Sequence, residues 1–514
     1  MDAILVAMRQ VKNAVCYLTI SILCAGCATA QRAWGIFNDA GFSPYVDEPA
    51  LAIAPGSLFQ LFGLSLGPKT PVRAASIPLP TALAGVSVRI TAGSTTIDAP
   101  ILSAESARIE AQLPANTPLG DAQLVVTSNG YEGPPLDFQV IRRSFAFYSA
   151  VQNRLPDGSW IPNTANHAAR PGGLVSLWGT GLGAGAGSDT YANLDPSPGL
   201  EVLVGGKPAR VVYAGDWSGV DLIVIEVPPV IGCNVWAKLR YPDGPGEDAP
   251  KTNSLNSVSF SISQESEACA GPFDPPPQIM DRIRAQYGLR MAVLGGSIEG
   301  FSLSVGHGIL PLAPAPGTCG LWEGAIGIPT LNAGATVSVH GPKGASSSFS
   351  FVPTDFGGRY AGPPQWPPVE PGEYTLENGK GGTDVGAFST SFTVPDSPFT
   401  WTNPDTRDIQ RDSDLHITWN GGDPKAGYVV VGILFAAGPP DSWFTQVGGT
   451  SCIARADQGT MTIPASDLWT TLTRSARRVL ISVSYYAPHF FEAPGIDAGA
   501  VFFAASSVRT LEIR

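Results

Sequence analysis

Charged residues make up only 14% of this 514-residue chain, and the patterns that mark common active sites are also missing. No GxSxG occurs, because GGSIEG at residues 295–300 lacks the last glycine at the needed spacing, and HExxH is absent. The histidines are few and far apart in the sequence: His167, His307, His340, His416 and His489. These absences predict a protein that is not an enzyme. A glycosidase-type pair of carboxylates stays open, because no sequence spacing reveals such a pair.

Positive charge is in deficit as well, since the formal net charge is -12. An acidic surface repels phosphate backbones and anionic lipids. We therefore expect neither nucleic acid nor an anionic membrane surface as a partner.

Long apolar runs are absent beyond residue 30. The one candidate is AVCYLTISILCA at residues 14–25, which follows Arg9 and Lys12 and precedes the small residues Ala28-Thr29-Ala30. This order is typical of a secretory signal peptide, which we place at residues 1–30. No later stretch approaches the roughly 20 apolar residues of a membrane helix, so we expect no membrane span.

Cys27 offers an alternative, in which it becomes a lipidated N-terminus. Ala25-Gly26-Cys27 resembles the end of a bacterial lipobox, although Cys24 stands where leucine is usual. On either interpretation we expect a secreted protein, extracellular or at the cell surface, with the periplasm also open.

Cysteine is sparse once the leader is removed, because only Cys233, Cys269, Cys319 and Cys452 remain. Exported cysteines usually oxidise, and four of them allow three pairings. We expect Cys233 to pair with Cys269 because both fall within one predicted module, which leaves Cys319 and Cys452 as a clasp between later segments. A metal site is disfavoured because these four show no CxxC spacing, and no cofactor is expected from them.

Glycine and proline, by contrast, are abundant at 59 and 47 residues, beside 44% hydrophobic residues. Turn residues at this density, with enough apolar residues for packed cores, favour short strands over disorder. At about 150 residues per domain, the length predicts three to four domains.

The chain also repeats itself. APGSLFQLFGLSLG at residues 54–67 returns as RPGGLVSLWGTGLG at residues 170–183, and the strand-ending Pro114 and Pro228 are spaced by a similar interval. Repeated segments of this size predict tandem modules that each close a core of their own. Apolar and polar residues alternate in stretches such as GVSVRI at residues 85–90, so each module is predicted to be an all-β sandwich.

The pattern PGxLxxLxGxxLG, with later strands ending in EAQLP or VIEVP, resembles the Ig-like modules related to the IPT/TIG type that occur in large secreted proteins of environmental bacteria. Those modules often carry a cysteine in the penultimate strand and another just past the last strand, which Cys233 and Cys269 match. The resemblance covers about residues 37–269 and implies two tandem sandwiches. The first copy lacks both cysteines, so it lacks this disulfide.

The second half of the chain has a different sequence pattern. GPFDPPP at residues 271–277 is a linker, and PQIMDRIRAQYG at residues 277–288 is the only stretch with a helical pattern, with Ile279, Ile283 and Tyr287 on one face. Strand signals resume after it, and LHITWNGGDP resembles a strand and turn of a fibronectin-like sandwich.

The predicted fold is therefore all-β, with tandem Ig-like β-sandwich modules and one short helix in the third unit. Its parts are a signal peptide at 1–30, Ig-like modules at 31–145 and 146–269, a linker, helix and sandwich at 270–395, and a fibronectin- or Ig-like module at 396–514.

One acidic cluster is a candidate calcium site, since Ca²⁺ often stiffens module junctions in exported proteins. Its members, in NPDTRDIQRDSD, are Asp405, Asp408, Asp412 and Asp414. The interleaved Arg407 and Arg411 and the missing DxDxDG spacing favour a solvated loop instead.

Aromatic residues in turn-rich contexts are candidates for binding a sugar or a protein. They are Trp366 in GPPQWPPVEPG, with Tyr485, Tyr486, His489, Phe490 and Phe491 in SYYAPHFFEAPG. Large apolar faces in such loops can meet a ligand. The alternative is that they are buried as plugs at the ends of sandwiches.

These observations favour a non-enzymatic, secreted or surface modular β-sandwich protein for adhesion, recognition, or envelope or matrix structure. Its partner would be a protein or glycan at the cell surface or in the matrix. The alternative is an extracellular carbohydrate-binding protein, or an accessory to a glycan-active enzyme, that uses the aromatic loops of the third and fourth modules. A third interpretation is a spacer within an envelope assembly.

Overall fold

The structure is a computed structural model. It describes residues 31–41, 52–183, 192–193, 200–217, 219–242, 251–264, 268–269, 277–285, 289–297, 299–309, 315–320, 325–354, 358–363, 365–367, 369–396, 399–404, 408–409, 413–423, 427–436, 446–465 and 478–513. The predicted signal peptide and Cys27 lie outside these residues. The chain forms two compact units: Met1–Asp39, Leu51–Ser144 and Gly181–Thr190 in unit 1, and Ala40–Ala50, Phe145–Thr180 and Tyr191–Arg514 in unit 2.

The chain is all-β, as predicted. Within the part of the chain that the structure describes, α2 (Pro277–Ala285) is the only α-helix, and no helix has the length and apolar character needed to cross a membrane. The helix begins at the proline where the sequence pattern begins, and proline is well suited to the first turn because its missing N–H would have no partner there.

Unit 1 is a β-sandwich. One sheet has the order β1-β3-β9-β8-β4, and the other has β2-β12-β10-β6-β5 in a row, with β11 on β10 and β7 on β6. The strands are β1 (Arg32–Asn38), β2 (Ala52–Ile53), β3 (Leu58–Leu64), β4 (Val72–Arg73), β5 (Ala82–Leu83), β6 (Val86–Ala92), β7 (Thr95–Asp98), β8 (Ile101–Ala104), β9 (Arg108–Gln112), β10 (Gly120–Ser128), β11 (Tyr131–Glu132) and β12 (Leu136–Val140). The alternation predicted for β6 is confirmed, because Val86, Val88 and Ile90 are all buried.

The described residues of the second module, in unit 2, form a ten-stranded sheet. Its order is β14-β13-β15-β19-β18-β17-β20-β21, with β16 on β18 and β22 on β20. The strands are β13 (Ala146–Arg154), β14 (Trp160–Pro162), β15 (Leu174–Thr180), β16 (Ala192–Asn193), β17 (Glu201–Val204), β18 (Lys207–Trp217), β19 (Val220–Glu226), β20 (Gly232–Pro242), β21 (Lys251–Asn253) and β22 (Val258–Ile262). β18 changes partner along its length, since residues 207–209 pair with β17 and residues 210–217 pair mainly with β19.

The two copies of the sequence repeat make the same hydrogen bonds. The Gly56 N–H donates to the Leu113 carbonyl, and the Gly172 N–H donates to the Val227 carbonyl, both at 2.8 Å. Both glycines have positive φ, 86° and 78°, which a side chain would oppose. The repeated Pro-Gly pair is therefore the turn that starts β3 in unit 1 and β15 in the second module.

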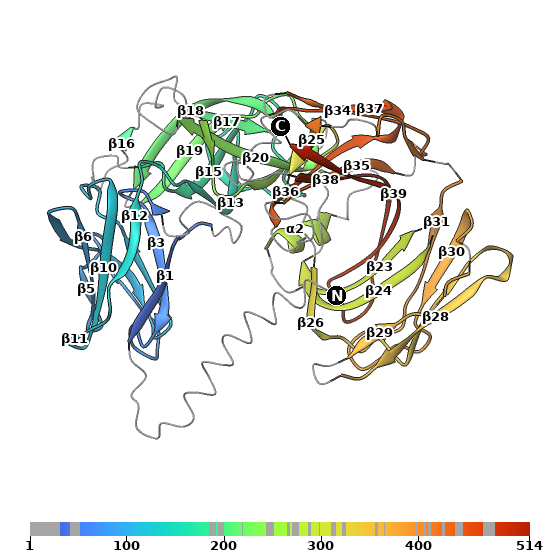
Figure 1. Cartoon of the computed structure of the whole chain (residues 1–514), viewed down its shortest axis with the longest axis horizontal. Helices are drawn as coiled ribbons and strands as arrows, with labels where there is room; N and C mark the ends of the chain where they lie inside the picture. Colours follow the sequence, from blue (N-terminus) through green and yellow to red (C-terminus); the bar gives the residue numbers. More distant parts are fainter. Residues whose placement is uncertain are drawn as a thin grey trace. The chain divides into compact units, whose positions relative to one another are not determined.

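Residues 289–513 form two sandwiches, called here the third and fourth sandwich, that share one nine-stranded sheet (Figure 1). This shared sheet has the order β25-β36-β35-β38-β39-β23-β24-β26, with β33 on β39. Its strands are β23 (Leu289–Ser297), β24 (Gly300–Ile309), β25 (Thr318–Gly320), β26 (Ala325–Thr330), β33 (Asp408–Ile409), β35 (Tyr428–Ala436), β36 (Gln446–Arg455), β38 (Arg478–Phe491) and β39 (Ala498–Ile513).

Two smaller sheets complete the sandwiches. The five-stranded sheet β29-β28-β27-β30-β31 belongs to the third sandwich, and the three-stranded sheet β32-β34-β37 belongs to the fourth. Their strands are β27 (Thr336–His340), β28 (Ser346–Val352), β29 (Arg359–Ala361), β30 (Gly372–Glu377), β31 (Ser389–Val394), β32 (Thr400–Trp401), β34 (Leu415–Asn420) and β37 (Thr460–Ile463).

The long hairpin β38–β39, dark red in Figure 1, contributes to both cores. On one face of β38, Tyr485 packs in the core of the fourth sandwich and Phe491 packs in the core of the third. On β39, Leu511 packs in the core of the fourth sandwich and Phe503 packs in the core of the third. The boundary predicted at residue 395 thus divides a sheet whose strands come from both sides of it, and the four-module division stays a prediction.

The third sandwich contains a tyrosine corner at the sequence PGEY. The Tyr374 hydroxyl donates to the Glu370 carbonyl at 2.9 Å and accepts from the Glu370 N–H at 3.0 Å. Both partners lie four residues upstream, so one buried side chain fixes the turn that leads into β30. This arrangement is a hallmark of Ig-like sandwiches.

Candidate functional site: two disulfide-bearing joints

Both predicted disulfides are present. Cys233 is bonded to Cys269 and Cys319 to Cys452, with Cα–Cα distances of 5.3 and 4.0 Å. Cys319 and Cys452 are directly opposite each other on the antiparallel strands β25 and β36. Each bond lies at a contact between the second module and the part of unit 2 that follows it.

The first contact, called here the helix joint, is made by α2 and the Cys233–Cys269 disulfide. Met280 of the helix is 1% exposed and packs against this disulfide and Ala165. The neighbouring Ile279 points the other way and packs against Leu289 at the start of β23. The helix is therefore a wedge between the second module and the shared sheet.

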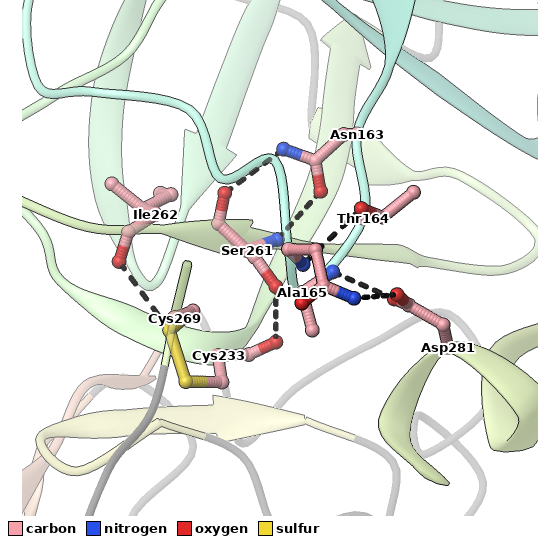
Figure 2. Close-up of a disulfide and its surroundings, with 9 residues drawn as sticks. Asn163, Thr164, Ala165, Cys233, Ser261, Ile262, Cys269 and Asp281 are labelled. Carbon is pink, nitrogen blue, oxygen red and sulfur yellow. Dashed lines mark hydrogen bonds between the residues drawn. A yellow bond between two sulfur atoms is a disulfide. The ribbon is translucent and has the colours of Figure 1, made fainter. Parts of the chain in front are cut away.

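Asp281 fixes the helix to a turn of the second module (Figure 2). Its Oδ1 accepts from the Ala165 N–H at 2.6 Å, and its Oδ2 accepts from the Asn166 side-chain amide at 3.4 Å. The Ala165 carbonyl accepts from the Cys269 N–H at 2.6 Å. A single residue of the turn is thus hydrogen-bonded to both the helix and the disulfide.

The same turn is held from its other side by polar side chains (Figure 2). Asn163 accepts from the Ser261 N–H at 2.8 Å and donates to the Ser261 carbonyl at 2.9 Å. The Ser261 hydroxyl donates to the Cys233 carbonyl at 3.0 Å. This network connects the turn to β22 and β20, so the helix joint has few degrees of freedom.

The second contact, called here the strand joint, places residues 315–320 against β20. The Ala315 N–H donates to the Asn234 carbonyl at 3.0 Å, next to Cys233. Gly320 lies against the Trp236 indole, where a Cβ would collide with the ring. Because β25 is also bonded to β36 through Cys319, this segment connects the second module to the fourth sandwich.

The cysteines and Asp281 of the two joints bind to other parts of the protein. The thiols are oxidised, and the Asp281 carboxylate accepts hydrogen bonds on both oxygens. Such an arrangement suits a structural junction between domains. Contacts between domains of one chain are often small and mobile. Two joints that each carry a disulfide favour a fixed arrangement of these domains instead.

The aromatic residues predicted to form a loop near residue 490 instead lie on strand β38, which corrects that expectation. Tyr485, Tyr486 and Phe491 are buried. The strand continues through Pro488, which is opposite Phe502, and β39 pairs with β38 along its whole length. The ligand-binding role predicted for these residues stays untested.

Tyr485, Tyr486 and Phe490 each contact other groups of the protein. The Tyr485 hydroxyl donates to the Asp423 carbonyl at 3.2 Å, and burial raises the pKa of Tyr485 to about 12. Tyr486 stacks on Phe502 at 5.2 Å between ring centroids, and burial raises its pKa well above the usual value. Phe490 packs edge to face on the same Phe502.

His489 lies between the two sheets of the third sandwich. Its Nε2 is 3.0 Å from the Thr390 hydroxyl of β31, and burial lowers the pKa of the imidazole. The neutral form is therefore favoured, which suits a hydrogen bond within the sandwich.

Trp366 closes one end of the third sandwich. Its ring lies 5.4 Å from that of Phe301 and 5.3 Å from that of Phe349, centroid to centroid, and it is half-buried against the core. This placement matches the alternative of an aromatic plug.

The predicted acidic cluster is only partly within the described residues. Asp405 and Asp412 lie outside them, Asp408 is in β33, and Asp414 accepts from the Ala465 N–H at 2.9 Å. Within the described ranges, no group of three or more His, Cys, Asp or Glu side chains is arranged to hold a metal ion.

Sequence patterns did not predict an exposed tryptophan in unit 1. Trp34 of the edge strand β1 is 57% exposed and stacks on Phe62 of β3 at 5.8 Å. Trp34 lies at a β-bulge, and Tyr148 of the second module lies at a register shift in the equivalent strand β13. An irregularity in strand pairing thus occurs at an aromatic residue in both modules, a signal that alternation alone does not give.

No protein-family profile matches the chain, and no curated protein matches it. Among solved structures, it is similar to a tetra-tandem repeat in the extending region of a large adhesion protein, at 11% identity, covering 93% of this chain and 99% of that chain, with a TM-score of 0.15. It is also similar to the S-layer protein rSbsC(31-844), at 10% identity over 94% of this chain and 54% of that chain, with a TM-score of 0.21. The N-terminal four Ig domains of Dscam1 isoform 8.4 match at 9% identity, over 90% and 96% of the two chains, with a TM-score of 0.11. TM-scores this low do not establish a shared fold, and neither architecture nor role is transferred from them.

Proposed function

We propose that this chain is an exported, non-enzymatic modular scaffold that acts in adhesion, recognition, or envelope or matrix structure. We further propose that residues 31–145 and 146–269 are Ig-like modules related to the IPT/TIG type. The carrying observation is that both disulfides lie at the two joints of the second module. Disulfides form and persist in oxidising compartments outside the cytosol. Cys233–Cys269 crosslinks the second module and Cys319–Cys452 crosslinks the shared sheet, each beside a contact between the two.

A scaffold has to hold its parts at defined positions, and the joints can do this. The helix joint connects the second module to the shared sheet, and the strand joint connects it to the fourth sandwich. A protein that presents or spaces a binding surface needs such fixed positions.

The first experiment locates the protein and its thiols in the cells that make it. Intact cells are treated with N-ethylmaleimide and fractionated, and the protein is mapped as non-reduced peptides. We expect the Cys233–Cys269 and Cys319–Cys452 peptides in the envelope fraction or the medium, with no alkylated cysteine. A cytosolic protein with alkylated thiols would contradict the proposal.

The second experiment asks whether the joints matter for partner binding. Purified residues 31–514 are immobilised and incubated with envelope extracts, beside the variants Asp281→Ala and Asp281→Asn. Asp281→Asn can keep the bond to Ala165, so retention of fixed partners should fall more for Asp281→Ala. Equal loss of all partners by both variants, together with turnover in a separate assay of hydrolase substrates, would favour an enzyme instead.

Glycan binding is a second candidate, supported by the exposed Trp34, which stacks on the partly buried Phe62. A glycan array compares the wild type with Trp34→Ala. Trp160→Ala is the matched control, because Trp160 is also exposed but lies under the Arg154 guanidinium instead of against an aromatic ring of the described residues. A specific signal lost only in Trp34→Ala supports glycan binding, and no signal for the wild type rejects it.

A further inference from the structure

The longest parallel strand pair in the described residues joins β23 to β39. Six residue pairs are in register, from Met291 opposite Ala498 to Gly296 opposite Phe503. The other parallel ladders, β2 with β12 and β33 with β39, have two pairs each. The β23–β39 pair is called here the clamp.

Strand direction decides how the clamp responds to tension along the chain. The chain enters the clamp at the start of β23 and leaves it through the end of β39. In a parallel pair these two points are at opposite ends of the ladder. Tension therefore slides one strand along the other and loads all the hydrogen bonds of the clamp together, whereas a pull on two adjacent ends would open them one at a time.

The clamp is well supported by its surroundings. Leu294 of β23 and Val501 of β39 are buried in the core of the third sandwich. At the open end of the ladder, the Asp497 N–H donates to the Arg290 carbonyl at 2.7 Å, and the Arg290 N–H donates to the Asp497 carboxylate at 2.9 Å. These bonds extend the region that must shear.

Everything between the two clamp strands is protected from tension while the clamp holds. That segment includes β24 to β38, and thus the five-stranded and three-stranded sheets of both sandwiches. The segment from β24 to β38 cannot be extended from its ends until β23 and β39 separate.

The Cys319–Cys452 disulfide is a second safeguard. It closes a loop with a sequence separation of 133, which contains β26 and the whole five-stranded sheet. If the clamp opens, the force passes through the Cys319–Cys452 bond, and the loop between these two residues bears none of it. At about 3.4 Å per extended residue, the bond withholds about 450 Å of chain.

We propose that residues 289–513 are a tension-bearing unit, in which the β23–β39 clamp resists rupture and the Cys319–Cys452 disulfide limits extension afterwards. The inference rests on the proposed function in one respect, namely that an exported scaffold experiences load. The mechanical property itself depends only on the fold.

The test is single-molecule force spectroscopy on residues 31–514 held through tags at both ends. We expect the clamp rupture to occur at a force at least twice that of unit 1, whose parallel ladder has two pairs. With dithiothreitol in the buffer, a further extension of about 450 Å should follow that rupture and not precede it, because Cys452 is buried while the clamp is closed. Without reductant this extension should be absent.

The matched control changes only the direction of the pull. A handle attached at an azide-bearing residue in place of Glu492, which is exposed in the turn before β39, puts both pulling points at the same end of the clamp. The rupture force should then fall at least twofold. Equal rupture forces for the two attachments, or the 450 Å step before any rupture, would overturn the proposal. Either result leaves the localisation experiment unaffected, so the two proposals fail separately.

Discussion

Asp216 has an unfavourable place for a charged side chain. It lies on β18 directly opposite Asp221 of β19, which is itself buried. Burial raises the pKa of the Asp216 carboxyl to about 6, against a smaller opposing effect of a hydrogen bond from the Gly219 N–H. The folded state therefore holds this proton more tightly than the unfolded chain, whose aspartate has a pKa near 3.8.

The sign of the pH dependence follows from this difference. The stabilisation from the protonated Asp216 is fully present below about pH 4 and is lost as the pH rises through about 6. We expect Asp216→Asn to raise the free energy of unfolding by about 1–2 kcal/mol at pH 7.5, after allowing for partial exposure of the carboxyl, and to change it little at pH 4. Urea denaturation at the two pH values measures this. Asp396→Asn, at an exposed position, is the control, and an equal gain at both pH values would contradict the assignment.

The tyrosine corner gives a second prediction for a single side chain. Tyr374→Phe keeps the ring but leaves the Glu370 N–H and carbonyl without the hydroxyl. We expect unit 2 to lose about 1–2 kcal/mol of unfolding free energy, as for other buried hydrogen bonds. Tyr131→Phe, where the ring is 77% exposed, should have no measurable effect in the same denaturation experiment.

At the scale of elements, the hairpin β38–β39 couples the third and fourth sandwiches. Ile481 lies in the fourth core and Phe491 in the third, on the same strand. Ile481→Ala and Phe491→Ala each remove a buried side chain, at a cost of about 2–5 kcal/mol. Because the hairpin belongs to both sandwiches, we expect each variant to speed amide exchange in β28 and β34 alike.

Hydrogen exchange with mass spectrometry distinguishes coupled from separate sandwiches. Leu61→Ala in the core of unit 1 is the control, and it should leave exchange in β28 and β34 unchanged. Faster exchange in β34 alone after Ile481→Ala would show that the sandwiches open separately.

Local sequence patterns predicted most individual strands but not their partners. The alternation that buries Val86, Val88 and Ile90 is a property of adjacent residues, and so is the helix that starts at Pro277. The pairing of β23 with β39, by contrast, joins residues about two hundred positions apart, which no local pattern encodes. The joints were not predicted for the same reason, since Asp281 binds to Ala165 and Asn166, which are more than one hundred positions away.

At residues 485–491 the sequence pattern predicted a loop where the structure has a strand. Proline and clustered aromatics are typical of a turn, yet here a strand alternates between cores on its two faces, and every aromatic side chain finds an apolar neighbour. The disulfide pairing was predictable because both members of the first pair lie in one repeat.

For the whole molecule, the two disulfides should differ in their effect on stability. In the chain-entropy account a crosslink stabilises more when it closes a longer loop, which gives about 4 kcal/mol for the separation of 36 and about 5 kcal/mol for that of 133. We expect Cys319→Ser with Cys452→Ser to lower the unfolding free energy of unit 2 more than Cys233→Ser with Cys269→Ser. Urea denaturation of the two double variants measures this, and the reverse order would show that native packing at the helix joint outweighs loop entropy.

The shared hairpin also constrains the order in which the chain can fold during synthesis. Residues 478–513 supply strands to both sandwiches, and they emerge from the ribosome after every other strand described here. Until residues 478–513 are made, the apolar faces of the five-stranded and three-stranded sheets are only partly covered by other strands. The last hairpin then completes two cores in one event, so the third and fourth sandwiches stay incompletely folded until residues 478–513 are made.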